Sequence, residues 1–476
     1  MADIRFGTDG WRAVIAEDFT FANVRAVAQA TADWMRRHGL QERGAVVGYD
    51  TRFLSEVFAN AVAEVLAGND IHVGLASSAA PTPAISHAVL QRNAGAGIVI
   101  TASHNPGRWN GFKIKQAVGN SAPPEVTAEI EQAIPGIITG DRVQIVAQGD
   151  AVARGLIERF DPRPTYVTAL RDFVDIEGIR AAGFNVAVDS MYGAAGGVTA
   201  DVIGEGATAV HEVHGERNPA FPGMRAPEPI AVNLGPLLKI VQGGGYDIGL
   251  ATDGDGDRLG LVGEDGTFIN QHQTFALLVR YLLEVRGERG AIVRSITSTK
   301  MVDLLGRRFD CPVFETPVGF KFLGPKMIEE DALIAGEESG GYAFRGHIPE
   351  RDGVLSGLLL LDYIVQTGKR PSQLLAELYE ELGRHEYDRV DITMRADERD
   401  EIAGRVARAE PQTIAGLPVV SKDTLDGFRF TVEGGWWLLI RFSGTEPLMR
   451  IYAEMPSTEH VRRALLDGQE LAGVAD

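Results

Sequence analysis

The sequence predicts an α/β protein in which three similar α/β domains precede a C-terminal α+β segment. Most of the first two-thirds alternates short β-branched runs with longer stretches of helical apolar spacing, which is typical of successive α/β units around largely parallel sheets. Three apolar strands open into polar, Gly-containing loops within residues 100–104, 250–254 and 334–341. Since the ligand crevices of open α/β sheets lie at the carboxyl ends of strands, these loops indicate three similar domains with equivalent loops.

The individual elements follow from local patterns along the chain. Runs rich in β-branched residues predict strands, and apolar residues spaced by three and four predict helices. The clearest strands are expected at residues 45–49, 97–101, 184–189 and 291–294. The clearest helices are expected at residues 21–38, 55–67, 271–285 and 301–307. Residues 436–441 then predict a strand and a following loop, in a segment whose strands and helices are segregated as in α+β folds.

The chain length and the breaks between strand and helix patterns predict the number and the bounds of the domains. A chain of 476 residues predicts about three domains, with two to four reasonable. The Pro-containing stretch 160–164 and the turn 264–266 are typical of linkers, and a third break falls near residues 368–371. The domains that we expect are therefore residues 1–160, 161–266, 267–376 and 377–476.

Composition and charge argue against several classes of protein. The chain is 45% hydrophobic and 23% charged, with no apolar run of transmembrane length and no charged-then-apolar leader, so we expect a cytoplasmic protein. A net charge of −19 argues against nucleic acid or an anionic membrane as partner, because both require a basic face. The single cysteine, Cys311, excludes an internal disulfide. An anionic small molecule would have to meet local clusters of Arg and Lys.

The run from Asp253 to Arg258 is the most informative motif. Asp253, Asp255 and Asp257 alternate with glycines between two apolar stretches, so three carboxylates can converge on one hard divalent cation. Their charge of −3 favours a cation that keeps one coordination site for a phosphate oxygen of a substrate. A calcium loop of the EF-hand type is an alternative, since Glu264 falls at position 12, but that loop requires Gly where this chain has Arg258. A solvated acidic turn is a second alternative.

The segment from Thr101 to Pro106 places Ser103 on a sharp turn after a strand, a geometry that exposes a nucleophile or a phosphate carrier. A plain turn built from Ser, Asn and Pro is the alternative. A hydrolytic serine is not expected, because no Gly-x-Ser-x-Gly elbow surrounds Ser103. A serine that faces a metal loop and cationic loops suits phosphoryl transfer, in which positioning and charge neutralisation provide most of the catalysis.

A fourth loop offers a phosphate site. Arg441, Ser443 and Thr445 supply a guanidinium fork and two hydroxyls, and the backbone around Gly444 adds amides, so that together they can hold a phosphate dianion. Arg450 on the following strand can add a second positive charge, although a surface role for this residue is equally open.

The chain resembles the α-D-phosphohexomutases, the phosphoglucomutase and phosphomannomutase superfamily, from end to end. Within that superfamily it is most similar to the phosphoglucomutases. The matching motifs occur in order at residues 6–12, 48–52, 101–106, 110–113, 253–258, 336–340 and 441–445. The resemblance implies three similar α/β domains with mixed sheets plus a C-terminal α+β domain, arranged around a central active-site cleft. It also implies a hexose phosphate as the bound partner and Mg²⁺ between Ser103 and the three aspartates.

The resemblance further implies a mechanism. Phosphorylated Ser103 would donate its group to the free hydroxyl of a hexose monophosphate, and the bisphosphate would turn over in the cleft before Ser103 takes back the other phosphate. Lys113 and Arg12 would stabilise the transferring group, and either Lys113 or His104 would act as general acid or base. Arg258 would contact phosphate or sugar. The other substrate-binding residues implied are Lys321, Glu337, Ser339, Arg441, Ser443, Gly444, Thr445 and Arg450.

Glucose is the expected sugar. Glu338 resembles the choice of the glucose enzymes, whereas Gly341 departs both from their usual Phe before the second Gly and from the His of the bifunctional enzymes. Segments 316–324 and 347–353 are similar to runs of phosphoglucomutases, the first of them bringing Lys321 to a phosphate. We therefore expect interconversion of glucose 1-phosphate and glucose 6-phosphate, with glucose 1,6-bisphosphate as intermediate and activator.

Several alternatives stay open at this point. The chain can be a phosphomannomutase or a dual phosphoglucomutase/phosphomannomutase. A phosphoglucosamine mutase, a glucose 1,6-bisphosphate synthase and a non-catalytic phosphosugar-binding protein are the other candidates, and the last would predict loss of Ser103 or of a metal-loop aspartate, neither of which is lost. The expected oligomeric state is a monomer or a homodimer.

Overall fold

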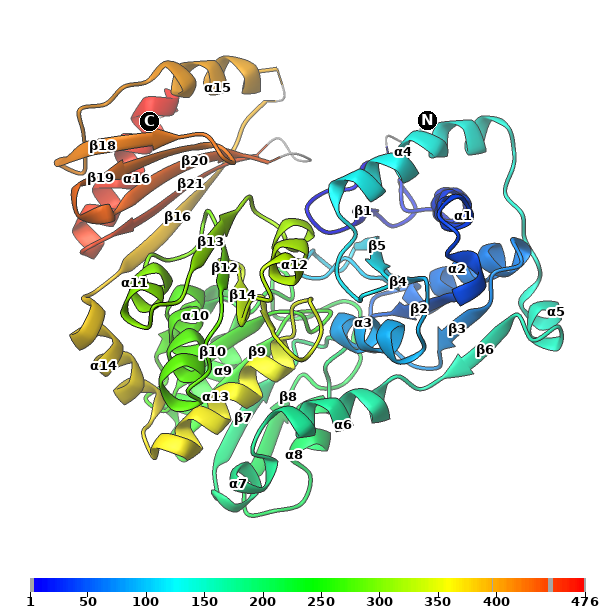
Figure 1. Cartoon of the computed structure of the whole chain (residues 1–476), viewed down its shortest axis with the longest axis horizontal. Helices are drawn as coiled ribbons and strands as arrows, with labels where there is room; N and C mark the ends of the chain where they lie inside the picture. Colours follow the sequence, from blue (N-terminus) through cyan, green and yellow to red (C-terminus); the bar gives the residue numbers. More distant parts are fainter. Residues whose placement is uncertain (1–3, 396, 444–447, 475–476) are drawn as a thin grey trace.

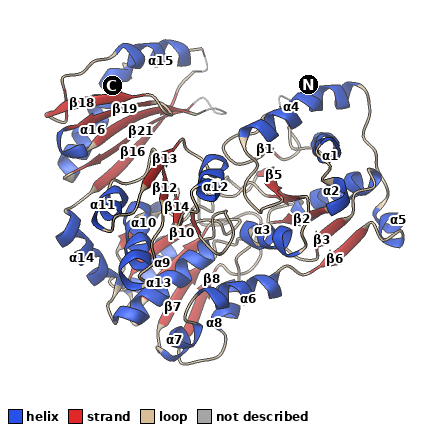
Figure 2. Cartoon of the chain, viewed as in Figure 1, coloured by secondary structure: helices blue, strands red, loops and turns tan. Residues whose placement is uncertain are grey.

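The computed structural model describes residues 4–395, 397–443 and 448–474. Four sheets follow one another along the chain, three of them mixed and flanked by helices and the last one antiparallel, which confirms the predicted fold class (Figures 1 and 2). Each sheet with its helices is called a domain below, numbered I to IV in chain order. Within the described residues, no helix combines the length and apolar character needed to cross a membrane.

Domain I contains a six-stranded sheet of order β1-β5-β4-β2-β3-β6. Strands β2, β3, β4 and β6 are parallel, and β5 and β1 continue the sheet in antiparallel fashion. The strands are β1 (Trp11–Val14), β2 (Ala45–Tyr49), β3 (Val73–Ala76), β4 (Ala96–Ile100), β5 (Trp109–Gln116) and β6 (Ile157–Phe160). The helices are α1 (Phe21–Arg37), α2 (Ser55–Gly68), α3 (Thr82–Gln91), α4 (Pro124–Thr139) and α5 (Gln148–Ala153).

Domain II contains a five-stranded sheet of order β11-β10-β9-β7-β8. Its parallel strands β8, β7 and β9 are extended by the antiparallel β10, and the short turn between β9 and β10 is the Asp253 loop. The strands are β7 (Asn185–Asp189), β8 (Ala209–Val213), β9 (Ile248–Thr252), β10 (Leu259–Gly263) and β11 (Phe268–Ile269). The helices are α6 (Arg163–Phe173), α7 (Ile176–Ala181), α8 (Val198–Ile203) and α9 (Gly235–Gln242).

Domain III contains a four-stranded sheet of order β13-β12-β14-β15. The strands are β12 (Ile292–Ser295), β13 (Val313–Thr316), β14 (Ile334–Gly336) and β15 (Tyr342–Phe344). The helices are α10 (Gln271–Arg280), α11 (Met301–Arg308), α12 (Phe320–Glu329), α13 (Gly353–Thr367) and α14 (Pro371–Leu382). The helix predicted over residues 271–285 is present as α10, and its last turn, Tyr281–Val285, has π-helical hydrogen bonding.

Domain IV is a six-stranded antiparallel sheet of order β16-β21-β20-β19-β18-β17, covered by two helices. The strands are β16 (Glu386–Thr393), β17 (Thr413–Ile414), β18 (Leu417–Asp423), β19 (Phe428–Val432), β20 (Trp437–Phe442) and β21 (Leu448–Met455). The helices are α15 (Arg399–Arg408) and α16 (Thr458–Ala472).

The buried apolar side chains divide the molecule into two unequal parts. One continuous core cluster runs through domains I, II and III, whereas domain IV has a core of its own. A small buried cluster joins domain IV to domain III and contains Ile296, Trp437, Leu439 and Tyr452. Figure 1 accordingly shows domain IV beside the domain III sheet and set apart from domain I.

Candidate active site

Two strand-end loops meet at the boundary of domains I and II. Ser103 follows β4, and its hydroxyl donates a hydrogen bond of 2.8 Å to the carboxylate of Asp253, which follows β9. The backbone of Ser103 has φ = +50°, a left-handed conformation that is uncommon for a residue with a Cβ. Backbone strain of this kind is concentrated at functional sites. The predicted carrier and the predicted metal loop are thus in direct contact.

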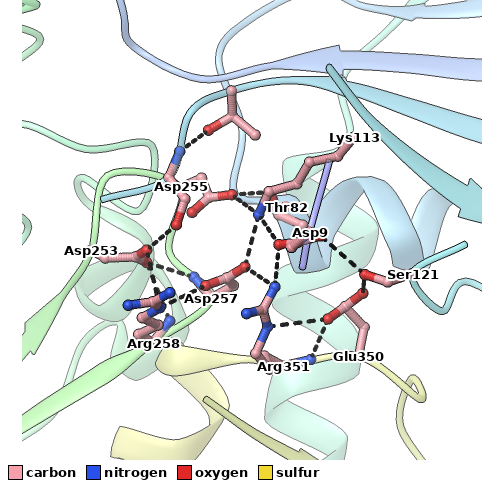
Figure 3. A network of polar contacts seen from close by, with 12 residues as sticks. Asp9, Thr82, Lys113, Ser121, Asp253, Asp255, Asp257, Arg258, Glu350 and Arg351 are labelled. Atoms are coloured by element: carbon pink, nitrogen blue, oxygen red, sulfur yellow. Dashed lines mark hydrogen bonds and ion pairs between the residues drawn. The ribbon is translucent and has the colours of Figure 1, made fainter. Parts of the chain in front are cut away.

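The three aspartates of the loop converge on one point (Figure 3). Each offers a carboxylate oxygen, the three oxygens lie within 4.8 Å of one another, and all three side chains are fully buried. One oxygen of Asp255 and one of Asp257 have no hydrogen-bond partner among the described residues. Burial and the neighbouring carboxylates of Asp257 and Asp255 raise the pKa of Asp253 well above its usual value. An all-oxygen, partly unsatisfied, mutually repelling set of this kind fits Mg²⁺.

Backbone hydrogen bonds from three domains fix the shape of this loop. The amide of Thr82 in domain I donates to Asp255, the amide of Ala194 in domain II donates to Gly254, and the amide of Gly353 in domain III donates to Gly256. A side chain on Gly254 would lie 2.5 Å from the carbonyl oxygen of Ser103, so the two loops can approach this closely only because residue 254 is glycine.

Lys113 on β5 lies against the acidic cluster. Its ammonium is 2.7 Å from both Asp9 and Asp255 and 3.0 Å from Asp257, and its side chain is 1% exposed (Figure 3). Burial lowers the pKa of Lys113, but the charges of Asp255, Asp257 and Asp9 outweigh that effect and raise it above the ordinary value. The three neighbouring carboxylates thus favour the charged form of Lys113.

The other predicted groups near Ser103 come from the same two loops and from β1. His104 lies 3.3 Å from the Ser103 hydroxyl, and burial together with Arg258 and Arg12 lowers its pKa well below the usual value. Arg12 donates a 2.7 Å hydrogen bond to the side chain of Asn105. Arg258 lies 4.0 Å from Asp253 and 3.9 Å from Asp257.

Arg351 is a central residue of the site to which the sequence reasoning gave no role. Its guanidinium pairs with Asp9, with Asp257 at 2.8 Å and with Glu350 at 3.3 Å (Figure 3). It also pairs with Glu337 at 3.0 Å. These partners come from domains I, II and III. Arg351 therefore joins the metal loop to the sugar loop predicted around Glu337.

The predicted sugar loop has two faces. Glu337 accepts hydrogen bonds from Arg351 and from Ser339, the latter at 2.7 Å, on the side of the acidic cluster. Glu338 instead accepts from Tyr387 at 2.8 Å and from Arg389 at 2.9 Å, both on β16 of domain IV. A Cβ at Gly341 would lie 2.2 Å from Cδ of Arg351, so the present position of the Arg351 side chain leaves no room for a larger residue at 341.

A cleft of 570 Å³ opens beside this buried centre, between domains I, III and IV. Lys321 lines it and donates a 3.0 Å hydrogen bond to the carbonyl of Gly7, and Arg441 lines it while pairing with Asp426 at 2.9 Å. The predicted site residues on its wall are Arg12, His104, Lys321, Arg441, Ser443 and Arg450. The sequence reasoning missed Arg5 and Asp9, which also line the cleft. Gly444 and Thr445 lie outside the described residues.

Comparisons with known proteins agree along the whole chain. Four models of the phosphoglucomutase/phosphomannomutase family match: α/β/α domain I at residues 3–139, α/β/α domain II at 164–266, α/β/α domain III at 270–382 and the C-terminal domain at 401–467. A "Phosphoglucomutase/phosphomannomutase" of Thermococcus kodakarensis is 31% identical over 469 residues, covering 98% of each chain. A "Probable phosphoglucosamine mutase" of Methanothermobacter thermautotrophicus is 31% identical over 461 residues, covering 96% of this chain and 95% of the relative. The solved "putative phosphomannomutase" of Thermus thermophilus has a TM-score of 0.85, 35% identity and 99% coverage of both chains.

Proposed function

This chain belongs to the phosphoglucomutase/phosphomannomutase family and is a phosphohexomutase, and we propose that it interconverts glucose 1-phosphate and glucose 6-phosphate through a phosphorylated Ser103. The contact between Ser103 and Asp253, at the edge of a cleft lined by Arg and Lys, is the observation that carries the proposal. The proposal is supported by the position of this hydroxyl, which contacts the acidic loop next to His104 on the cleft wall. Phosphoryl transfer needs positioning and charge neutralisation of this kind.

We assign the residues to two tasks. In the buried centre, Ser103 holds the phosphoryl group, and Lys113 neutralises negative charge as the group moves between serine and sugar oxygens. Asp253, Asp255 and Asp257 would hold Mg²⁺, which would supply further neutralisation of the phosphoryl oxygens. His104, 3.3 Å from the hydroxyl, is the neighbour best placed to take up or return its proton.

The second task belongs to the cleft. Arg441, Ser443 and Arg450 line the cleft and are proposed to hold the phosphate that is not transferred. Glu337 and Ser339 are hydrogen-bonded to each other outside the cleft lining, and we propose that they bind adjacent sugar hydroxyls. A bisphosphate intermediate must present each phosphate to Ser103 in turn. A roomy cleft with a wall of cations suits a ligand that binds in two orientations.

The choice of glucose rests on the segment around Lys321. Of the three segments that favoured glucose in the sequence, this one lines the cleft, whereas Glu338 is turned to domain IV and His347 is paired with Asp352 at 2.9 Å. Mannose 1-phosphate is the second candidate substrate, supported by the names of the Thermococcus and Thermus relatives. Glucosamine 1-phosphate, supported by the name of the Methanothermobacter relative, is the third.

A coupled mutase assay tests the proposal. Specificity constants are measured for glucose, mannose and glucosamine 1-phosphates with a trace of the matching bisphosphate. We expect glucose 1-phosphate to be the best substrate. Mannose 1-phosphate should react less well but measurably, because water can still bridge to its repositioned 2-hydroxyl. The amino sugar, which lacks that hydroxyl, should be the poorest substrate. A preference for the amino sugar would overturn the glucose assignment while leaving the mutase reaction in place. Strict dependence on an added acyl phosphate donor would instead identify a bisphosphate synthase.

A further inference from the structure

Arg52 is a fully buried arginine whose two terminal nitrogens both point at the Ser103 loop. It follows β2 at the start of the turn into α2, and its side chain is 0% exposed. One terminal nitrogen donates to the carbonyls of Pro106 at 3.0 Å and Trp109 at 3.1 Å. The other donates to the carbonyls of Ser103 at 2.6 Å and Asn105 at 2.5 Å. The four N–H groups of the fork are thus matched with four carbonyls of the loop that carries Ser103.

The guanidinium is itself held rigidly. Its Nε lies 3.2 Å from Asp50, whose other carboxylate oxygen accepts from the Arg52 amide at 2.9 Å and from Ser55 at 2.7 Å. The ring of Phe221 in domain II lies 5.0 Å from its carbon centre, within cation–π distance. Arg52 therefore links the Ser103 loop to the end of β2 and to domain II.

The Ser103 loop requires donors for its buried carbonyls. Four of these carbonyls point at Arg52, and Ser103 has the strained left-handed backbone conformation. Buried carbonyls without partners are destabilising, and a strained residue persists only where its surroundings over-determine it. Lysine could not replace Arg52, since a compact ammonium has three donors and lacks the planar fork that spans four acceptors.

We propose that Arg52 is a positioning residue for phosphoryl transfer: by binding four carbonyls of the Ser103 loop, it holds the serine hydroxyl at one point beside Asp253. This inference rests on the proposed function, in which Ser103 must donate and accept a phosphoryl group from the same place. The hydrogen bonds of the Arg52 guanidinium go to backbone carbonyls of the loop and not to the Ser103 hydroxyl. A displacement of about 1 Å at the reacting centre can lower the rate about 100-fold.

The first test compares Arg52→Lys and Arg52→Ala with wild type, well below the unfolding temperature of each. We expect kcat of both variants to fall about 100-fold, while KM for glucose 1-phosphate changes less than about threefold. Methylguanidinium, which can fill the space left by Arg52→Ala, should restore at least a tenth of wild-type kcat to that variant and leave Arg52→Lys unchanged. Arg36→Lys, which alters a donor to the carbonyl of Asn69 elsewhere in domain I, is the matched control and should retain wild-type kcat.

A second measurement needs no turnover. Amide hydrogen exchange of residues 101–110 should accelerate in Arg52→Ala and slow again when methylguanidinium is added. Unchanged exchange of this loop overturns the proposal, as does a folded Arg52→Lys with kcat within threefold of an active wild type. If neither variant folds under any condition, Arg52 is a requirement of the fold and the positioning role is wrong. If exchange is faster in Arg52→Ala than in wild type but wild type has no mutase turnover, the result contradicts the proposed function alone.

Discussion

The buried centre around Ser103 and the open cleft beneath domain IV differ in how they are built. The centre lies within the continuous core of domains I to III, and its side chains are almost completely buried and paired across domain boundaries. The cleft is bounded on one side by domain IV, which has a separate core and meets domain III through a small apolar cluster and a few polar contacts. The proposed chemical centre is therefore assembled in advance, while part of the wall proposed to hold phosphate belongs to a domain with a core of its own.

This difference matches two different demands on a mutase. Transfer to and from one serine needs fixed geometry, and a fixed site is best built on rigid, densely packed elements. Binding a sugar phosphate in two orientations needs space and charge more than close fit. If the comparison is right, changes in the centre lower kcat, and changes on the cleft wall raise KM.

The largest effect is expected from removing the carrier. Ser103→Ala should lower kcat by more than about 10³-fold, because the variant lacks the hydroxyl that holds the phosphoryl group beside Asp253. Steady-state mutase kinetics measure it. Ser86→Ala makes the same chemical change at a buried serine of α3 and should stay within twofold of wild type. Substantial turnover by Ser103→Ala would contradict the assignment of the phosphoryl carrier to the buried centre.

Metal-loop changes should come next. Asp255→Asn should lower kcat about 100-fold or more, and chelation with EDTA should do the same to wild type until Mg²⁺ is restored. Thermal unfolding gives an independent measure. Added Mg²⁺ should raise the Tm of wild type, by neutralising carboxylates that repel one another, and raise that of Asp255→Asn much less. Asp265→Asn, in the turn beyond β10, is the control and should respond as wild type does. Full activity in EDTA would mean that the Asp253 loop has a structural role and does not bind a catalytic metal ion.

A smaller and different effect is expected on the cleft wall. Arg441→Ala should raise KM about 10- to 100-fold with kcat nearly unchanged, since a charged hydrogen bond to phosphate contributes about 1.5–3 kcal/mol in ground state and transition state alike. Arg463→Ala, on the outer face of α16, should change neither constant. A fall in kcat without a rise in KM would mean that domain IV takes part in the chemistry and that the two regions do not divide the work.

The smallest effect concerns the seam between domains III and IV and should appear in stability, with catalysis unchanged. Arg429 on β19 donates to both carboxylate oxygens of Glu315 on β13, at 2.6 and 2.7 Å. Burial raises the pKa of Glu315, but the hydrogen bonds and charge of Arg429, with that of Arg294, lower it to about 2. A depressed pKa gives stability that is complete above the ordinary carboxyl pKa and is lost as the pH falls through about 2.

Glu315→Gln should therefore lower the free energy of unfolding by about 2 kcal/mol at pH 7 and make it less dependent on pH below about 4.5. Urea unfolding at a series of pH values measures both effects. The exposed Glu433→Gln in domain IV is the control and should follow wild type. Equal pH dependence in Glu315→Gln and wild type would show that this contact does not stabilise the seam.

The features that could be predicted from the sequence are those that local sequence pattern determines. The α/β class, the strands before the Ser103 and Asp253 loops and the distinct character of the last domain follow from periodicity and from Gly-containing turns. Resemblance then supplied the pairing of the two loops, and the structure places their side chains in hydrogen-bond contact. Local pattern was sufficient here because each loop is the direct continuation of a buried strand.

The remaining features depend on packing between distant segments. Arg351 joins Asp9, Asp257 and Glu337, and Arg52 gathers the carbonyls of the Ser103 loop, yet neither role can be read from neighbouring residues. Glu338 carried the sugar argument in the sequence, but its side chain turns to β16 because Tyr387 and Arg389 stand there. Side-chain direction at a domain boundary is set by the partner domain, which a local motif does not contain.

The phosphate on Ser103 tests the central claim most directly. Peptide mass spectrometry of protein purified without phosphatase treatment should find phosphate on Ser103, and one equivalent of glucose 1-phosphate should remove it in a single turnover while glucose 1,6-bisphosphate appears. The account predicts that loss of the serine phosphate and formation of the bisphosphate have the same rate. Phosphate found only on other residues, together with normal turnover by Ser103→Ala, would contradict it.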